Sequence, residues 1–357
     1  MSGQFKVINF LRVPLTVLVV ALHAYTATRT VSWLHDGYPI YKFVMHNLAL
    51  LSGYIPVPFF FFISGFLFFY SSSGTIVYNE KWKRRLHTLF IPYILWNFLV
   101  IILFYIVQTS SIGESFLSGE HKLVVSFSWY DFLRAFWDMG QGGTSGFPIL
   151  SVYWYIRNLM ILSLLAPVIR YFNLWFKYVW LIPFLLHWLF TPNLALTSCS
   201  IFWFGAGTYF AYRKVDWNVF CKYWKTETTC FFFFFITYNV IFFFKVDIVF
   251  AVFVNRMCVL CAIPVVYILI SKGISKWHWE MPSLFNKACF FVFSCHFFII
   301  IAIRKLSIKL FPHVCDMGAV LLYFFSIVLT LSISLGIFVL LRKFIPRMLN
   351  VFTGGRN

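Results

Sequence analysis

The sequence has few charged residues. Only 11% of its 357 residues are Asp, Glu, Lys or Arg, and 61% are hydrophobic, whereas about 25% of an ordinary soluble domain is charged. A water-soluble fold needs more polar surface than this to cover its exterior, and a disordered chain is far less apolar. The scarcity of charge therefore excludes both classes and indicates a polytopic membrane protein.

Acidic residues are the scarcest of the charged residues. The chain has 11 Asp and Glu against 29 Lys and Arg, which gives a formal net charge of +18. In a soluble protein this excess would suggest a nucleic-acid partner, but here the cations are spread over loops and do not form a dedicated basic domain. We therefore expect no nucleic-acid partner. The positions of the cations indicate instead which loops lie on the cytoplasmic side of the membrane.

The sequence also lacks a disulfide framework, internal repeats, low-complexity linkers and any segment that would form a soluble domain. Most of its eight Cys lie in apolar stretches, where Cys behaves as a small hydrophobe. Cys258 and Cys261 form a C-x-x-C without a second Cys pair, which favours packing over metal or redox chemistry. We expect no metal site and a single integral-membrane domain over residues 1–357.

Long apolar runs are abundant. A helix needs about 20 mostly apolar residues to cross a membrane, and the sequence predicts an all-α bundle of about ten transmembrane helices. The predicted ranges are 7–25, 50–70, 89–107, 150–169, 175–191, 198–212, 228–244, 248–270, 283–303 and 317–341.

The loop charges favour one orientation of these spans. With the N-terminus inside, 17 of the 29 Lys and Arg fall on the cytoplasmic side, eight on the opposite side and four deeper within spans. The loop at 304–316 departs from this pattern. We expect both termini, including the tail at 342–357, to be cytoplasmic. The first span is read as a retained helix, because Arg12 interrupts its apolar face and no small-x-small cleavage site follows it.

The longest loop, 108–149, is then extracytoplasmic. It carries Glu114, Glu120 and Asp131 among aromatic residues such as Trp129 and Trp137. Loops of this length are uncommon unless they are functional. Aromatics near carboxylates suit a sugar or headgroup site, and they equally suit an amphipathic helix at the membrane interface. Both interpretations stay open.

Charged residues inside spans are costly and usually face a bundle interior or a wet cavity. Arg12 and His23 share the first span and are eleven residues apart, so both lie on one helix face, about 16 Å apart along the axis. Arg12 can hold an anion, and His23 can accept a proton near neutral pH. In the alternative interpretation, Arg12 extends to the interface and His23 caps the helix end.

Five motifs occur in a consistent order over residues 5 to about 345. They are the Arg12–His23 pair, the Phe-rich span that ends in Ser64-Gly65, a basic cluster with Arg84 and Arg85 that leads to Ile91-Pro92-Tyr93, Trp154-Tyr155-Ile156-Arg157 at the entry to a middle span, and Ser294-Cys295-His296 in a late span. In these motifs and in their order, the chain resembles the integral-membrane acyltransferases of acyltransferase family 3.

The resemblance implies transfer of an acyl group, usually acetyl, from its coenzyme A thioester to a sugar hydroxyl. Many members of the family O-acetylate surface polysaccharides or lipid-linked sugars, and capsular polysaccharide, O-antigen, a lipid-linked precursor and peptidoglycan all fit as acceptors. Acyl-CoA is then a substrate, and no permanently bound cofactor is expected. The protein is expected in the plasma membrane, most simply the bacterial inner membrane.

The resemblance also implies roles for individual residues. His23 would be the general base with Arg12 beside it, and Arg84 and Arg85 would bind the coenzyme phosphates. Where the family often has a second Arg, three residues after Arg85, this chain has Thr88. Arg84 and Lys81 are candidates to replace that Arg.

The remaining candidates are each open to a second interpretation. Arg157 and Trp154 line the donor cavity or form a cation–π pair. Ser64 is either a nucleophile or part of a small-residue helix contact, and His296 either handles a second proton or is a hydrogen-bonded core residue. Arg256 has no counterpart among the motifs, and Asp247 is its candidate partner.

A transporter or exporter of a glycan or lipid-linked sugar is the main alternative function, since ten spans with buried cations also suit that class. The sequence has no paired halves with corresponding broken helices, which transporters often show. A non-enzymatic membrane scaffold is disfavoured by the number of buried Arg and His residues.

Overall fold

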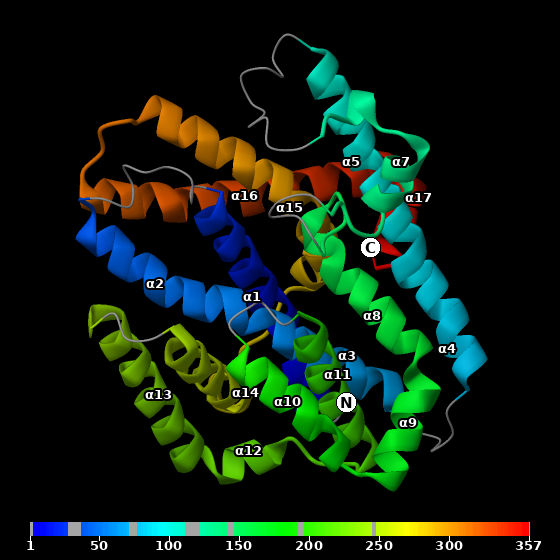
Figure 1. Cartoon of the computed structure of the whole chain (residues 1–357), viewed down its shortest axis with the longest axis vertical. Coiled ribbons are helices and arrows are strands. Elements are labelled where there is room, and N and C mark those ends of the chain that lie inside the picture. Colours follow the sequence, from blue (N-terminus) through cyan, green and yellow to red (C-terminus); the bar gives the residue numbers. More distant parts are fainter. Residues whose placement is uncertain are drawn as a thin grey trace. The chain divides into compact units, whose positions relative to one another are not determined.

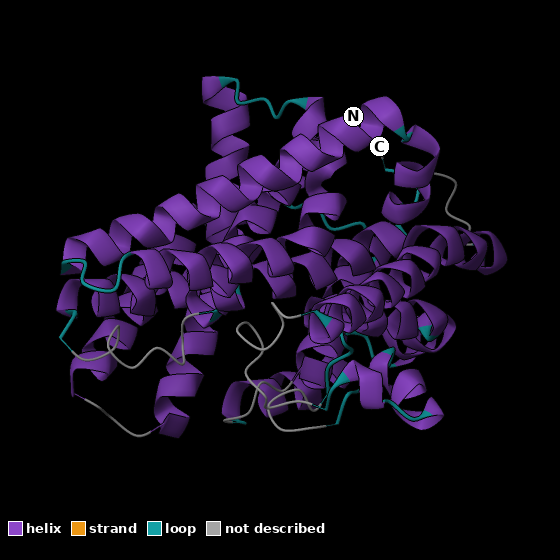
Figure 2. Ribbon diagram, turned by 90° about the horizontal axis from the view of Figure 1, so that it is seen from above, coloured by secondary structure: helices purple, strands orange, loops and turns teal. Residues whose placement is uncertain are grey.

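The computed structural model describes residues 3–27, 37–70, 77–110, 122–140, 146–191, 196–244 and 248–356. In these ranges every regular element is a helix and none is a strand (Figures 1 and 2). The chain divides into two compact units, which are described separately below. Unit 1 comprises Met1–Ile76 and Ala166–Val339, and unit 2 comprises Val77–Leu165 and Leu340–Asn357.

Unit 1 contains most of the long helices. They are α1 (Gly3–Thr26), α2 (Pro39–Tyr54), α3 (Pro56–Phe69), α9 (Ala166–Trp175), η6 (Val179–Leu181), α10 (Ile182–Phe190), α11 (Leu196–Tyr212), α12 (Asn218–Lys222), α13 (Trp224–Phe244), α14 (Ile248–Trp277), α15 (Ser283–Leu310) and α16 (Asp316–Phe344), whose last residues belong to unit 2.

Unit 2 contains the basic segment and the long loop. Its elements are α4 (Tyr78–Arg85), the π-helical turn η2 (Leu86–Phe90), α5 (Ile91–Thr109), η3 (Val124–Ser126), α7 (Trp129–Ala135), η5 (Ser151–Tyr153), α8 (Trp154–Leu164) and α17 (Pro346–Thr353). The tail at 342–357 is therefore folded, since α17 packs on α5 through Trp96 and Phe352.

All ten predicted ranges coincide with helices. In the described residues, seven helical stretches are long and apolar enough to cross a membrane, with α2 and α3 counted as one stretch and α4 to α5 as another. The number is eight if α8 and α9 form one broken span. The segments α10 and α11 are shorter than 18 residues, so the count of ten crossings stays a prediction. The polytopic helical class is confirmed.

Proline and a distant carboxylate fix where α2 begins. Pro39 occupies the first turn, where its missing N–H costs no hydrogen bond. The carboxylate of Asp316, at the start of α16, accepts hydrogen bonds from the backbone N–H groups of Ile40 and Tyr41, each at 2.7 Å. The helix thus starts eleven residues before the predicted span.

The α3 and α11 helices make a close contact through glycine. A Cβ atom on Gly65 would overlap the carbonyl of Phe204, and a Cβ on Gly207 would overlap the carbonyl of Phe62. Small residues allow helix backbones to approach this closely in membrane proteins. Ser64-Gly65 therefore takes part in helix packing, one of the two interpretations of this motif.

We expect Gly207→Val to destabilise unit 1 by about 1–3 kcal/mol, because the backbone atoms that it would strike cannot rotate away as a side chain does. The measurement is the midpoint of thermal unfolding in detergent. Gly336→Val is the matched control, since a Cβ on Gly336 in α16 meets nothing within 4 Å. Equal midpoints for the two variants would contradict this account of the contact.

Candidate active site

The α1 and α15 helices lie side by side and run in the same direction. In the middle of α1 and the first half of α15, Cys289 hydrogen-bonds with Thr16 and lies close to Arg12. Seven residues further along each helix, the rings of His23 and His296 lie 5.3 Å apart between centroids. Arg12 and His23 therefore both lie on the side of α1 that faces α15, as their spacing predicted.

His23 as a whole residue is partly exposed, whereas His296 has no exposed surface. The edge of Phe297 also packs on His23, with centroids 5.2 Å apart and the two planes at 87°. The His23 ring therefore packs against two aromatic residues of α15.

Hydrogen bonds assign the tautomer of His296. Its Nδ1 lies 3.1 Å from the carbonyl oxygen of Val292 and 2.8 Å from that of Phe293. Carbonyl oxygens only accept, so Nδ1 carries the proton. In the part of the chain that the structure describes, Nε2 has no hydrogen-bond partner. In neutral His296 this nitrogen therefore presents a lone pair within the protein.

In unit 2, the basic cluster lies at the end of α4. Arg84, Arg85 and Lys81 are close enough to repel one another electrostatically. Tyr155, from the start of α8, lies beside Arg85, and Trp82 donates a hydrogen bond from Nε1 to the carbonyl of Ser163 at 2.8 Å. The structure thus brings the basic cluster and the Trp154-to-Arg157 motif together within one unit.

The turn after the cluster is joined to the C-terminus. Pro92 has no N–H, so the α-helical donor for the carbonyl of Thr88 is missing. Arg356 instead donates from Nη1 to this carbonyl at 2.8 Å, and to that of Thr353 at 2.8 Å. Gly354 makes this possible, because it has φ of 60° and a Cβ atom there would lie 2.7 Å from the Cα and carbonyl oxygen of Thr88.

The model of one protein family, described as an acyltransferase domain, matches residues 5–339. This match spans nearly the whole chain and includes both histidines and the basic cluster. The protein belongs to acyltransferase family 3. Neither a curated protein nor a solved structure matches it.

In this family 3 acyltransferase, Arg157 binds residues of the long loop at 108–149. Its guanidinium carbon lies 5.2 Å from the ring centre of Trp137. It donates one hydrogen bond to the carbonyl of Trp137 and another, at 2.9 Å, to that of Gly146. The cation–π partner is Trp137 of the loop. The donor-binding roles of Arg157 and Trp154 stay predictions.

The described part of the long loop contains the short helix α7. Trp129 is 75% exposed and Tyr130 is 66% exposed, which agrees with aromatic residues at a membrane interface. Residues 111–121 and 141–145 lie outside the described residues, and so do Glu114 and Glu120. The choice between a ligand site and an interfacial helix therefore stays open for this loop.

Asp131 stabilises the start of α7. Its carboxylate accepts hydrogen bonds from Lys122 Nζ at 2.5 Å and from the hydroxyl and backbone N–H of Ser128, at 2.6 and 2.8 Å. These bonds, with the one from Lys122 contributing most, lower the pKa of Asp131 well below its usual range. The ionised carboxylate therefore favours the folded form of this segment.

We expect Asp131→Asn to increase hydrogen exchange at 128–135 near pH 6. A carboxyl whose pKa is lower in the folded form stabilises that form above its unfolded pKa of about 3.9, and the contribution is lost as the pH falls through the folded pKa. The difference between wild type and variant should therefore shrink below about pH 4. Mass spectrometry, corrected for intrinsic exchange, measures it. Equal protection at pH 6 would contradict this role.

The sequence alone assigned no role to Tyr323, Arg304 or Arg256. Tyr323 donates its hydroxyl hydrogen to the carbonyl of Ala21 at 2.7 Å, and Arg304 contacts Tyr41 from 263 positions away. Arg256, 4% exposed, lies 5.8 Å from the ring of Trp188, while its candidate partner Asp247 lies outside the described residues. For the two arginines, the signal in the sequence was a charge within or next to a span, and Tyr323 gave no such signal.

Proposed function

We propose that this protein is a membrane-embedded O-acyltransferase that moves an acyl group, most simply acetyl, from acyl-CoA to a hydroxyl of a cell-surface or lipid-linked carbohydrate. The observation that carries the proposal is the pairing of His23 with His296 on two parallel helices in a family 3 acyltransferase. In this proposal His23 is the general base.

The reaction needs a single proton acceptor near the acceptor hydroxyl. The hydroxyl oxygen bonds to the thioester carbonyl carbon, the carbon–sulfur bond breaks, and His23 takes the hydroxyl proton. The same proton then passes to the coenzyme A thiolate as it leaves. Each step balances without a metal or a redox partner.

His296 supports this role as a positioning residue. Its Nδ1–H is held by two backbone carbonyls, so its Nε2 can accept a hydrogen bond from one ring nitrogen of His23. That hydrogen bond would fix the His23 tautomer and leave the second nitrogen as the base, as the carboxylate does for the histidine in serine hydrolases. Ser64, the residue before the glycine that contacts α11, is not needed in this scheme.

The donor is held by cations in this proposal. Arg84, Arg85 and Lys81 repel one another in the unliganded protein, and a polyanionic coenzyme relieves that repulsion. Tyr155 supplies aromatic surface beside Arg85, and Trp154, the residue before it, is the second aromatic candidate for donor binding. Arg12 lies near Cys289 of α15, eleven residues before His23 on α1, and in this proposal it meets an anionic or carbonyl group of the donor.

The orientation that we propose places both termini in the cytoplasm of a bacterium, with the protein in the inner membrane. The cation distribution supports this, because 17 of the 29 Lys and Arg fall on that side. Acyl-CoA then reaches Arg84 and Arg85 from the cytoplasm, and the glycan reaches His23 from the opposite face.

The test uses the full-length protein in proteoliposomes, with labelled acetyl-CoA outside and candidate glycans inside or outside. Release of free coenzyme A thiol together with label in an alkali-sensitive ester on the glycan would support the proposal. Movement of a glycan across the bilayer with no thiol release would overturn it in favour of a transporter.

A further inference from the structure

The π-helical turn η2 (Leu86–Phe90) joins the basic cluster of α4 to α5 in unit 2. At its end, the N–H of Ile91 donates to the carbonyl of Leu86, five residues back, whereas the spacing in an α-helix is four. Turns of this kind are rare and occur frequently at functional sites. Because η2 follows Arg84 and Arg85 directly, the contacts that hold this turn also determine how the two arginines are placed.

The turn sets the angle between the faces of α4 and α5. A π-helical turn adds one residue, which shifts the face of every later residue by about 100° relative to an uninterrupted α-helix. Both helices are anchored in unit 2, because Trp82 of α4 donates to the carbonyl of Ser163 and Trp96 of α5 donates to that of Phe352. Relaxation of the turn would therefore rotate the basic cluster away from α8 or break one of these anchors.

Arg356 holds the turn from the end of α17. Its Nη1 donates to the carbonyls of Thr88, within η2, and of Thr353, each at 2.8 Å. Both acceptors are backbone atoms, so these bonds fix the path of the chain itself. Since Pro92 has no N–H to donate to the Thr88 carbonyl, Arg356 supplies a donor there from 268 positions away. A guanidinium suits this task, because it is always charged and its N–H groups have a fixed geometry.

Gly354 allows α17 to end directly against the turn. It has φ of 60°, and a Cβ atom there would lie 2.7 Å from the Cα and carbonyl oxygen of Thr88. The preceding Thr353 is fully buried, and its hydroxyl donates to the carbonyl of Leu349 at 2.8 Å. The end of α17 is thus fixed on η2 through backbone contacts, and Arg356 reaches the turn in one defined position.

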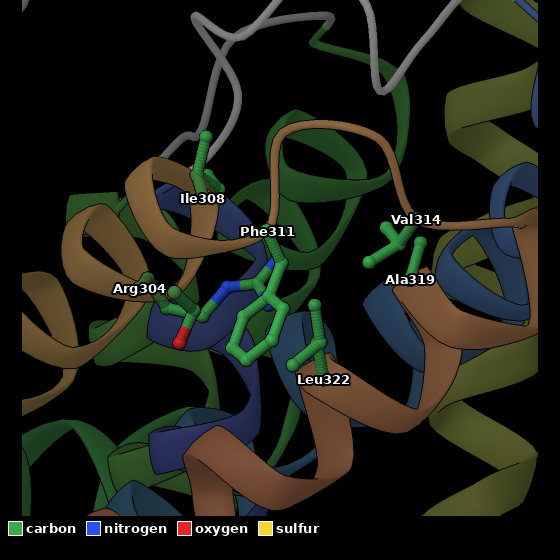
Figure 3. A pocket seen from close by; sticks show the side chains of 7 residues that line it. Arg304, Ile308, Phe311, Val314, Ala319 and Leu322 are labelled. Atoms are coloured by element: carbon green, nitrogen blue, oxygen red, sulfur yellow. The ribbon is translucent and has the colours of Figure 1, made fainter.

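Arg304 of unit 1 is a held arginine of a different kind. It is 2% exposed, its Nη2 donates to the hydroxyl of Tyr41 at 3.2 Å, and its guanidinium carbon lies 5.7 Å from the ring centre of Tyr323. Figure 3 shows it extending from α15 behind Phe311, in a small pocket between α15 and α16. These contacts join helices of unit 1, so loss of this guanidinium provides a control for the loss of a structural arginine outside unit 2.

We propose that Arg356 is a positioning residue for acyl-CoA. It holds η2 at Thr88 and thereby keeps Arg84 and Arg85 directed at the phosphates of the coenzyme. This inference rests on the proposed function, because it takes the α4 cluster as the donor site, and it adds the tail at 342–357 to that site. The arginines of α4 bind the phosphates, and Arg356 acts on them through the backbone of the turn.

Binding of coenzyme A and of pantetheine, which has no phosphates, to the full-length protein in phosphatidylcholine nanodiscs tests the inference. Arg356→Gln should raise the Kd of coenzyme A by about five- to tenfold and leave that of pantetheine within about twofold. Gly354→Ala should have the same selective effect although it keeps every charge, because its Cβ would strike the Thr88 backbone. The kcat at saturating acetyl-CoA, measured in parallel, should stay within about twofold of wild type.

The coupling between Arg356 and the α4 arginines distinguishes positioning from direct attraction of the donor. In a protein that already carries Arg84→Gln and Arg85→Gln, Arg356→Gln should raise the Kd of coenzyme A by less than about twofold, because the arginines that it positions are gone. An equal fold increase in both backgrounds would overturn the inference, since Arg356 would then act on the coenzyme by itself.

Three control variants should leave the Kd of coenzyme A within about twofold of wild type. Gly355→Ala changes a glycine with φ of 78° whose Cβ would meet nothing within 4 Å, so it separates the contact with Thr88 from backbone strain. Arg347→Gln removes an exposed cation from α17. Arg304→Gln should lower the midpoint of thermal unfolding without a selective effect on coenzyme A.

Two further results would overturn the inference. One is an unchanged Kd of coenzyme A in both Arg356→Gln and Gly354→Ala. The other is a selective rise in Arg304→Gln as large as that in Arg356→Gln, which would point to general destabilisation. An unchanged Kd in the protein with Arg84→Gln and Arg85→Gln would instead contradict the donor site of the proposed function, and this inference with it.

Discussion

Replacing His23 by glutamine is expected to lower the rate of acyl transfer by about 100- to 10,000-fold, the usual contribution of a positioned general base. Glutamine keeps a polar side chain beside His296 but has no basic nitrogen. The acyl-CoA concentration at half-maximal rate should change little, because the proposed donor ligands are untouched. The measurement is initial rates of ester formation in proteoliposomes at saturating acyl-CoA.

His46→Phe is the matched control for this loss. His46 is a second histidine within a span, in α2, and its ring stacks on Tyr238 and Phe242 with centroids 4.2 and 3.8 Å away. Phenylalanine keeps the stacking, so this variant should retain most activity. Comparable loss in both variants would point to general damage of the bundle, and near-normal activity of His23→Gln would remove His23 from the mechanism.

The second large effect is expected from Arg84→Gln combined with Arg85→Gln. Each hydrogen bond to a charged group contributes about 1.5–3 kcal/mol, so the double variant should raise the KM for acetyl-CoA by about 10- to 100-fold, with some attraction retained through Lys81. Acetyl-pantetheine, which has no phosphates, should be used equally well by wild type and variant. The ratio of the two KM values measures phosphate recognition alone.

Arg213→Gln combined with Lys214→Gln provides the comparison. This pair of adjacent, exposed cations also belongs to the side predicted to be cytoplasmic, so it removes the same charge from another place. Its KM for acetyl-CoA should stay within about twofold of wild type. An equal rise in both double variants would mean that overall charge, and not the α4 cluster, attracts the donor.

The helices were largely predictable because hydropathy dictates them. Every predicted range is largely helical, but not every range is one helix. The range 50–70 covers the end of α2 and α3, the range 150–169 bends by 63° between α8 and α9, and α2 begins at Pro39. Lys42, His46 and Asn47 interrupt the apolar window there. The N-terminal turn of α2 is instead fixed by Asp316 from 276 residues away, and no local pattern encodes such a contact.

The candidate site was predictable only along a single helix. The eleven-residue spacing predicts that Arg12 and His23 lie on one face of α1, and in the structure both residues lie next to α15. The pairing of His23 with His296 needs the register between two helices, which side-chain packing sets. Arg356 at Thr88 and Tyr323 at Ala21 depend on contacts across 268 and 302 positions.

The arginines assigned to donor binding differ in how well their surroundings support the predicted roles. Arg84 and Arg85 form a cationic cluster with Lys81, and Tyr155 lies beside Arg85, which suits a polyanionic donor. Arg157 already binds the carbonyls of Trp137 and Gly146. Its surroundings favour a role in holding the loop, and a spacing argument could not separate the two uses.

The central claim is that His23 catalyses the attachment of an acyl group to a surface carbohydrate. The most direct test is the amount of alkali-labile O-acetyl ester on glycans from cells that express wild type or His23→Gln at equal protein levels, measured by mass spectrometry. Our account predicts the ester with wild type and its near absence with the variant. Equal ester in both, or none in either, would contradict it.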